Sequence, residues 1–274
     1  MADRSSTARA KKKTATRKKP TAKKTTTKRT AAKKKATAKK TSTRNKPPTR
    51  RRGPAYPTAP GAPRRRVPNP ALPEILDTLQ REYPDAHCEL NHRNAFELLI
   101  ATILSAQCTD VRVNMVTETL FEKYPGPEHF VAAPIEEIEE DIRSTGTFRN
   151  KARNIKKACR AIVEEHGGEV PRDMEALKAL GGVGRKTANV VMGNVWNEPD
   201  GVVVDTHVTR LSRKLALTNK EDAVQIEREL NRLIPREHWV MFPHWLIFHG
   251  RRVCKARNPR CDECVLYAYC PTRA

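Results

Sequence analysis

Large apolar side chains are missing from the start of this 274-residue sequence. Between Ala2 and Ala55 there is no Leu, Ile, Val, Met, Phe, Trp or Tyr. Such a segment cannot bury enough apolar surface to offset the entropy lost on ordering, so we expect residues 1–66 to form a disordered tail. The missing apolar run also argues against a secretory signal peptide, and no later stretch is long and apolar enough to predict a membrane-spanning helix.

Acidic side chains are almost as scarce at this end of the chain. Residues 1–70 contain 25 Lys and Arg but only one acid, Asp3, whereas the remaining 204 residues contain 28 Lys and Arg and 30 acids. The Lys-Lys-Thr-Ala-like repeats of the tail resemble a linker-histone tail in composition. Long basic segments bind nucleic-acid phosphates through counterion release, so we expect nonspecific DNA binding by the tail. A solubilising or targeting extension is the alternative.

Cysteines are few, odd in number and clustered at one end. The count of seven, with no signal peptide, indicates a reducing compartment. The last four follow the pattern C-x6-C-x2-C-x5-C, which predicts a metal site. Zinc usually uses two C-x2-C pairs, and only one is present, so the spacing leaves zinc and an iron–sulfur cluster open. We expect the other three in the core. The clustered cysteines are Cys254, Cys261, Cys264 and Cys270, and the others are Cys88, Cys108 and Cys159.

Apolar residues recur at helical spacing after Pro70, and period-two alternation is scarce, so the sequence predicts an all-α fold. Segment 94–107 is apolar on most sides and is expected to be a central helix, and Asp110 is expected to cap the next helix. The stretch 201–205 is too short to anchor a sheet. The predicted helices span 71–83, 94–107, 110–124, 134–144, 150–166, 173–180, 185–196, 205–215, 222–234 and 237–250.

The stretch LGGVGRKTANVV, at 180–191, places three glycines between two predicted helices. It is not a nucleotide-binding loop, because Arg185 stands where that motif needs Gly and a helix precedes it. We expect a tight turn in which Gly181 or Gly182 is left-handed, Val183 points inward and Gly184 leaves its backbone bare. The amides of the turn and of the helix that follows would then bind a DNA phosphate without reading sequence. An ordinary helical hairpin is the alternative.

Lys186 lies in the first turn of the helix that begins at about Arg185. The positive end of the helix dipole disfavours an ammonium there, and partial burial would disfavour it further. Lys186 is therefore a candidate free amine and nucleophile. The alternative is a solvated lysine, or one that pairs with a phosphate.

Several motifs together resemble the endonuclease III family of DNA glycosylases with AP-lyase activity. They are LGGVGRKTANVV, VDTHVTRLSRKL, AQCTD and the closing cysteines, and the resemblance covers about residues 70–271. It implies a six-helix barrel with a helix-hairpin-helix at 88–198 and a helical [4Fe–4S] domain formed by 67–87 plus 199–274. The four clustered cysteines would hold that cluster, in a mainly structural role.

The same resemblance implies roles for individual residues. Lys186 is the nucleophile that attacks the anomeric sugar carbon, and Asp205 is its acidic partner, although an Asp before a helix is also a good cap. Gln107 fills the space left by the extruded nucleotide, and His207 lies near the DNA backbone. Their alternatives are a polar residue at a helix end and a surface histidine. The residues expected to contact DNA are Gln107, Thr147, Gly182, Gly184, Arg185, His207, Lys255, Arg257 and Arg260.

Three positions depart from the family pattern. Gly181 replaces a proline of the hairpin, which loosens the turn. Thr147 stands where an apolar residue often enters the opposite strand, so Thr147 is a weak wedge to which Phe148 contributes. Lys178 stands where some members carry an acid, which alters the charge of the pocket.

These observations predict a bifunctional glycosylase that acts on oxidised pyrimidines and abasic sites in double-stranded DNA. The related monofunctional adenine glycosylase is an alternative, but it lacks a lysine at position 186 and carries a further C-terminal domain. A non-catalytic, cluster-containing DNA-compaction protein suits the tail but gives no purpose to Lys186 and Asp205. We expect a monomer with no membrane association, located in the cytoplasm with the nucleoid, with targeting by the tail left open.

Overall fold

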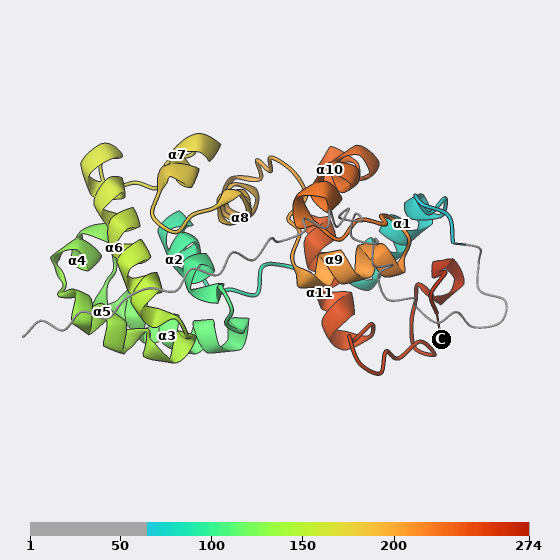
Figure 1. Ribbon diagram of the computed structural model, residues 1–274, viewed down its shortest axis with the longest axis horizontal. Helices are drawn as coiled ribbons and strands as arrows, with labels where there is room; N and C mark the ends of the chain where they lie inside the picture. Colours follow the sequence, from blue (N-terminus) through green and yellow to red (C-terminus); the bar gives the residue numbers. More distant parts are fainter. Residues whose placement is uncertain (1–64, 274) are drawn as a thin grey trace, which may run out of the picture. The chain divides into compact units, whose positions relative to one another are not determined.

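A computed structural model describes residues 65–273. The predicted disorder and DNA binding of the tail concern residues outside this range, apart from Arg65 and Arg66. The described residues form α-helices and short 3-10 turns without a strand, so the all-α prediction is confirmed (Figure 1). None of the described helices has the length and apolar character needed to cross a bilayer.

The helices follow the sequence prediction closely, with one addition. They are α1 (Leu72–Glu82), α2 (Ala95–Ser105), α3 (Asp110–Lys123), α4 (Pro127–Ala132), α5 (Ile135–Asp141), α6 (Phe148–Glu165), α7 (Met174–Ala179), α8 (Arg185–Trp196), α9 (Thr206–Lys214), α10 (Ala223–Leu233) and α11 (Met241–Arg252), with 3-10 turns η1 (Arg143–Thr145), η2 (Arg236–His238) and η3 (Tyr267–Tyr269).

Two separate hydrophobic cores organise the described residues. The first is built from α2 to α8, between Leu90 and Met192. The second combines α1 with α9, α10 and α11, so that residues 72–86 pack with residues 202–266 (Figure 1). The division into a helix-hairpin-helix barrel at 88–198 and a discontinuous cluster domain remains a proposal, which these two cores support.

The central helix of the first core is α2, as expected. Leu98, Leu99, Ile100 and Leu104 have no exposed surface, and the helix packs against α3, α6 and α8. Cys159 of α6 is also fully buried in this core, whereas Cys88 and Cys108 are half-buried at its edge. Because α2 is buried on most sides, its carboxyl end is fixed relative to α6 and α8.

The cap of α3 is Thr109, not Asp110. The Thr109 hydroxyl accepts a hydrogen bond from the Arg112 amide at 3.3 Å, and Asp110 is the first residue of the helix. Thr and Asp are both favourable caps, which is why the pattern placed the cap one residue too late. The Asp110 carboxylate instead forms an ion pair with Arg251 of α11 at 2.5 Å.

Two further differences concern helix starts. The six-residue α4 was not predicted, because it is too short to show a helical period, although Gly126 before Pro127 is a favourable start. The last helix begins at Met241 rather than 237. Pro243 is tolerated only in the first turn of a helix, so the residues before it form the separate turn η2.

Candidate active site and cysteine pocket

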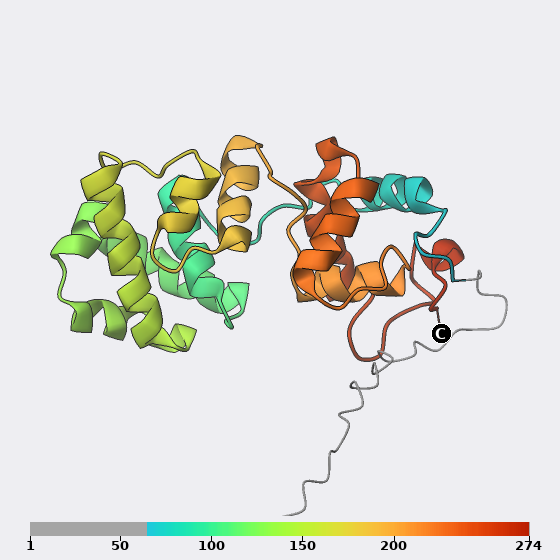
Figure 2. The same cartoon turned by 45° about the horizontal axis from the view of Figure 1, so that its top comes forward.

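The turn between α7 and α8 has the predicted hairpin form (Figure 2). The Val183 amide donates to the Leu180 carbonyl at 3.2 Å, and Gly182 has a φ of 77°. A positive φ at the third residue of such a turn is the type II pattern and favours glycine. Val183 is 6% exposed and anchors the turn in the first core, as expected.

Gly181 allows the hairpin to approach α6 closely. A Cβ atom at this position would lie 2.6 Å from Lys157 Cβ and 2.7 Å from the Asn154 carbonyl oxygen. The glycine that departs from the family pattern is thus matched by close packing on α6. A larger residue here would force the hairpin away from that helix.

The start of α8 is open. Gly184 is its N-cap and provides no side-chain hydrogen bond, and a Cβ added to Gly184 would meet nothing within 4 Å. The first amides of the helix are therefore accessible to an anion. Lys186 lies in this first turn and its side chain is exposed, so the partial burial considered from the sequence is not found.

The start of α9 is closed by Asp205. One carboxylate oxygen of Asp205 accepts a hydrogen bond from the Val208 amide at 2.7 Å, so the capping role considered from the sequence is confirmed. Asp205 is only partly exposed. Its position at the cap fixes the carboxylate relative to the rest of α9.

Asp110 is the acid that sequence reasoning did not assign to the site. Burial raises the pKa of Asp110, the negative charge of Asp205 raises it further, and the positive charges of His207 and Lys186 lower it. Asp205, Lys186 and His207 therefore all lie near enough to interact with the Asp110 carboxylate, and we group these four residues as one charged cluster. The only sequence signal was the place of Asp110 in the AQCTD segment, where a capping role was a sufficient explanation.

His244 of α11 adjoins this cluster. Its Nε2–H donates to Asn194 Oδ1 of α8 at 2.9 Å. Burial lowers the pKa of His244 to about 4, His87 lowers it further, and Asp205 opposes the shift. The neutral imidazole therefore fastens α8 to α11 close to Asp205.

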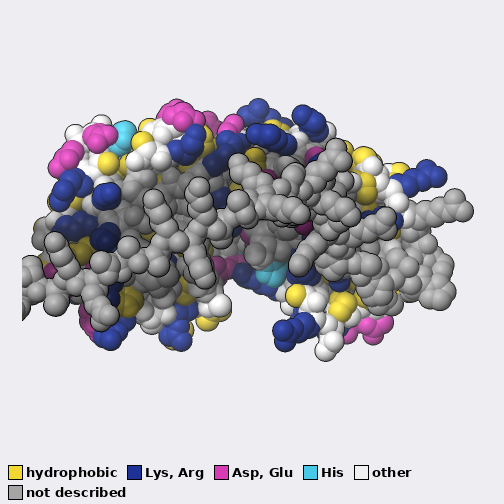
Figure 3. Space-filling model, viewed as in Figure 1, with side chains coloured by type: hydrophobic (Ala, Val, Ile, Leu, Met, Phe, Trp, Pro, Cys, Tyr) yellow, Lys and Arg dark blue, Asp and Glu magenta, His cyan; other side chains and the backbone are white. Residues whose placement is uncertain are grey.

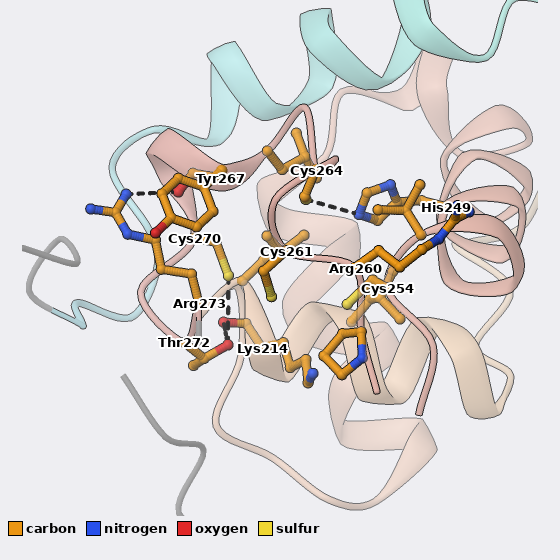
Figure 4. Close-up of a pocket in the computed structure, with 15 residues that line it drawn as sticks. Lys214, His249, Cys254, Arg260, Cys261, Cys264, Tyr267, Cys270, Thr272 and Arg273 are labelled. Atoms are coloured by element: carbon orange, nitrogen blue, oxygen red, sulfur yellow. Dashed lines mark hydrogen bonds between the residues drawn. The ribbon is translucent and has the colours of Figure 1, made fainter. Parts of the chain in front are cut away.

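The four clustered cysteines line a single pocket beside the second core (Figure 4). Leu211, Leu215 and Leu266 supply apolar walls. Burial raises the pKa of the Cys264 thiol to about 12 and also raises that of Cys254, which Lys214 and Arg210 lower. Thiols bind metals as thiolates, so occupancy of this pocket releases protons.

His249 lines this pocket next to Cys264. His249 Nδ1 lies 2.9 Å from the Tyr83 hydroxyl, and His249 Nε2 lies 3.5 Å from Cys264 Sγ. With the hydroxyl donating to Nδ1, the Nε2–H points toward the sulfur. Among residues 65–273, no three Cys, His, Asp or Glu side chains form a site for a single metal ion. Geometry alone therefore does not choose between zinc and an iron–sulfur cluster.

Comparison with known proteins decides both the cofactor class and the family. Residues 100–236 match the HhH-GPD superfamily of base excision DNA repair proteins, and residues 254–270 match the iron–sulfur binding domain of endonuclease III. The chain is 54% identical to endonuclease III of Synechocystis over 199 residues, which are 73% of this chain and 91% of that protein. Endonuclease III of Bacillus subtilis is 51% identical, over 71% of this chain and 89% of the relative.

The chain belongs to the endonuclease III family. A solved non-covalent endonuclease III–DNA complex has a TM-score of 0.70 and 50% identity, covering 73% of this chain and 94% of that chain. A trapped endonuclease III–DNA covalent intermediate matches with the same values. This family member is a base excision DNA glycosylase and AP lyase. The predicted [4Fe–4S] cofactor is confirmed, and the four thiols with their apolar walls fit it.

Cys254, Cys261, Cys264 and Cys270 would hold the cluster, which would then link the irregular segment after α11 to the second core. Residues 253–273 contain only the short turn η3, so they have little helical hydrogen bonding of their own. When bound, the cluster supplies covalent cross-links among the four cysteines.

Two further predicted DNA contacts lie on exposed turns with left-handed backbone. Gln107 follows α2 with a φ of 56°, and Thr147 precedes α6 with a φ of 43° after Gly146 at 70°. A β-branched residue with positive φ is strained. Both side chains are exposed, and their contacts with DNA remain predictions.

The predicted basic contacts differ in what they already bind. The Arg185 guanidinium forms ion pairs with Asp200 at 2.5 Å and Glu227 at 2.7 Å. Arg260 pairs with Glu263 at 2.7 Å and donates to the Arg252 carbonyl. His207 Nδ1 lies 3.3 Å from Arg210 Nη2, and Lys255 and Arg257 are exposed. DNA contact by each stays a prediction.

Proposed function

We propose that this protein removes oxidised pyrimidines from duplex DNA and cleaves the strand at the resulting abasic site through a Schiff base on Lys186. The observation that carries the proposal is the placement of Lys186 at an open helix start, directly after a turn suited to a phosphate. The electrostatic interactions of Asp110 with Lys186, Asp205 and His207 support it.

The proposed reaction balances with groups of the protein, the DNA and water. The uncharged Lys186 Nζ attacks the anomeric carbon C1′, and the bond from C1′ to the base breaks as the base leaves with the electron pair and takes a proton. The sugar ring then opens as the C1′–O4′ bond breaks, O4′ takes the proton released from Nζ, and a C1′=N imine is left. The imine acidifies C2′, which loses a proton while the C3′–O bond breaks and the 3′ phosphate leaves with the electron pair. Water then hydrolyses the imine and restores the amine.

Each neighbouring group has a role in this proposal. Asp205 stabilises the positive charge that develops on the sugar and assists proton transfers. Gln107 fills the space that the extruded nucleotide leaves, and Thr147 contacts the base that loses its partner. The amides around Gly182 and Gly184 hold a phosphate of the same strand.

Borohydride trapping tests the role of Lys186. Borohydride reduces the imine, so the wild-type protein should become covalently attached to a duplex that contains one oxidised pyrimidine. Lys186→Ala should abolish this adduct, whereas Lys178→Ala, which removes another lysine of the hairpin, should retain it. Trapping that persists in Lys186→Ala would exclude Lys186 as the nucleophile. Excision of adenine from a mispair without an adduct would favour the monofunctional alternative.

We also propose that residues 1–66 bind DNA phosphates without sequence preference and that the protein acts as a monomer. The composition of the tail supports the first part, because residues 71–274 are close to neutral, and the face seen in Figure 3 carries Lys and Arg as well as Asp and Glu among its described residues. Deletion of residues 1–66 should lower the salt dependence of DNA affinity while single-turnover cleavage is preserved. Equal affinity at every salt concentration would contradict the proposal.

A further inference from the structure

Lys151 is a lysine buried in the first core. Its side chain lies in the opening turns of α6 and the residue is only 4% exposed. The ammonium donates to the Leu104 carbonyl at 2.8 Å and to the Thr145 carbonyl at 2.7 Å. Within the described range no carboxylate pairs with it. Burial of an ammonium that donates only to carbonyls costs desolvation free energy, so we expect Lys151 to serve a function at this position.

The two carbonyls belong to the ends of two different elements. Leu104 lies in the last turn of α2, three residues before Gln107, and Thr145 ends η1, two residues before Thr147. Carbonyls at helix ends lack intrahelical partners, and a cation satisfies them well. The Lys151 side chain therefore joins the end of α2 to the end of η1.

The backbone of Lys151 holds the second of these turns as well. Its amide donates to the Thr147 carbonyl at 3.2 Å, and the Asn150 amide donates to the same oxygen at 3.0 Å. Thr147 is strained at φ 43°, and such strain persists only when the surroundings enforce it. Lys151 thus contacts the Thr147 turn through both its backbone and its side chain.

We propose that Lys151 is a positioning residue that fixes the Gln107 turn and the Thr147 turn relative to each other, so that both enter the duplex as one unit. This inference rests on the proposed function, in which these two side chains replace the extruded nucleotide and support the opposite base. Lys151 does not touch the reacting sugar. It sets the spacing of the groups that open the helix.

The proposed role of Lys151 concerns the opening of the DNA duplex and not the reaction at the sugar. Loss of the Lys151 ammonium frees two carbonyls and lets the turns shift, which affects only a substrate that must be opened. An abasic strand whose complement lacks the nucleotides opposite the lesion keeps its flanking duplex but has no base to displace. Lys186 acts on the sugar in the same way in both substrates.

The test compares single-turnover cleavage of an abasic site in full duplex and in this gapped duplex. Lys151→Met, which keeps the length but loses the donors, should slow cleavage of the full duplex on the order of 10-fold to 100-fold. The gapped substrate should be cleaved within about threefold of the wild-type rate, because only misplacement of the turns is at stake. Equal slowing of both substrates, or no slowing of either, would overturn the inference.

Two further variants keep the result interpretable. Lys156→Met is the matched control, because Lys156 lies on the same helix and donates to the Ala133 carbonyl at the end of α4, away from both turns. Lys156→Met should leave the ratio of the full-duplex cleavage rate to the gapped-duplex cleavage rate unchanged. Lys151→Arg keeps the charge and has several N–H donors, but its planar guanidinium presents them in a different geometry from the compact ammonium. Lys151→Arg should lower the ratio of the full-duplex rate to the gapped-duplex rate, but by less than Lys151→Met does. If the Met variant does not fold, an unchanged ratio in a folded Lys151→Arg protein contradicts the inference.

Failure of the inference is distinguishable from failure of the proposed function. Lys186→Ala should lose cleavage of both substrates, because it removes the nucleophile itself. If Lys186→Ala still cleaves, the proposed chemistry is wrong whatever Lys151 does. If Lys186→Ala is inactive and Lys151→Met slows both substrates alike, only the positioning role is wrong.

Discussion

The starts of α8 and α9 present opposite solutions to the same problem. Every helix begins with amides that have no intrahelical partner. At α8 the cap is Gly184, which leaves the amides open, and a lysine follows in the first turn. At α9 the Asp205 carboxylate caps the helix by accepting a hydrogen bond from the Val208 amide. One start is prepared for an external anion, and the other is occupied by an internal one.

The two helix starts differ in how the proposed function affects the stability of the helix. An open start with a cation is a poorly stabilised helix end, and the protein retains it where the proposed nucleophile lies. The closed start at α9 stabilises its helix and holds a carboxylate rigidly beside the same site. In the proposed mechanism, stability and catalysis therefore oppose each other at α8 and coincide at α9.

The largest expected effect separates the two roles of Asp205. Asp205→Asn keeps a good cap but removes the charge, whereas Asp205→Ala removes both. Both variants should lose cleavage by roughly 10²-fold to 10³-fold, as expected for a group that assists charge development and proton transfer. Only Asp205→Ala should also lose about 1 kcal/mol of unfolding free energy. Single-turnover rates and urea unfolding measure the two effects.

Asp222→Ala is the matched control for that experiment. Asp222 caps α10 through the Gln225 amide at 3.0 Å and has no proposed part in the reaction. It should lose about the same 1 kcal/mol as Asp205→Ala and keep its rate. If Asp205→Asn retains the wild-type rate, Asp205 serves only as a cap and the comparison between α8 and α9 loses its catalytic meaning.

The sequence predicted the fold well where the pattern was long and local. The α8 boundaries were predicted without error, because Gly184 and a regular apolar period define both ends. The short α4 was missed, because a six-residue helix has no measurable period. The start of α11 was predicted at 237 instead of Met241, because the position of Pro243 in the first helical turn was not taken into account. The two cores combine distant segments, and pattern alone does not show which segments pack together.

Those residues of the candidate site that lie in specific motifs could be predicted from the sequence. Lys186, Asp205 and the four cysteines stand in motifs whose spacing is specific. Asp110 was taken for a cap, because its pairing with Arg251 joins residues 141 positions apart. Lys151 had no signal at all, since a lysine on a helix is ordinarily solvated. Burial of a polar group is a tertiary property, and it was visible only in the structure.

A smaller effect concerns the contact that holds α8 near Asp205. The pKa of His244 is lowered by burial from its ordinary 6.5 to about 4. The unfolded chain therefore binds a proton below pH 6.5 that the folded protein accepts only near pH 4. The stability from neutral His244 is fully present above pH 6.5 and is lost as the pH falls toward 4, with roughly 2 kcal/mol already lost at pH 5.

Urea unfolding at pH 7 and pH 5 measures this loss. His244→Gln should show a smaller drop in unfolding free energy between the two pH values than the wild type. His129→Gln is the control, because His129 is exposed on α4 and pairs only with Glu128. Equal drops in the wild type and in His244→Gln would show that His244 does not titrate with folding and that acid does not loosen α8 in this way.

The smallest expected effect comes from making the start of α8 resemble that of α9. Gly184 has an extended backbone, and the space around its Cβ position is empty, so Gly184→Asp fits without strain. Its carboxylate should cap α8 and raise the unfolding free energy by about 0.5 kcal/mol, because Gly at a cap is only slightly worse than Asp. The same carboxylate occupies the proposed phosphate position, so DNA affinity should fall roughly tenfold at low salt.

Gly184→Ser distinguishes capping from charge in this last case. Serine caps α8 as Asp does but brings no charge, so its affinity for an abasic duplex should stay within about threefold of the wild type. The loss in Gly184→Asp should shrink as salt is raised, because the repulsion between carboxylate and phosphate is screened. If the two variants bind DNA equally, the amides at the start of α8 do not hold a phosphate, and the open helix start has another cause.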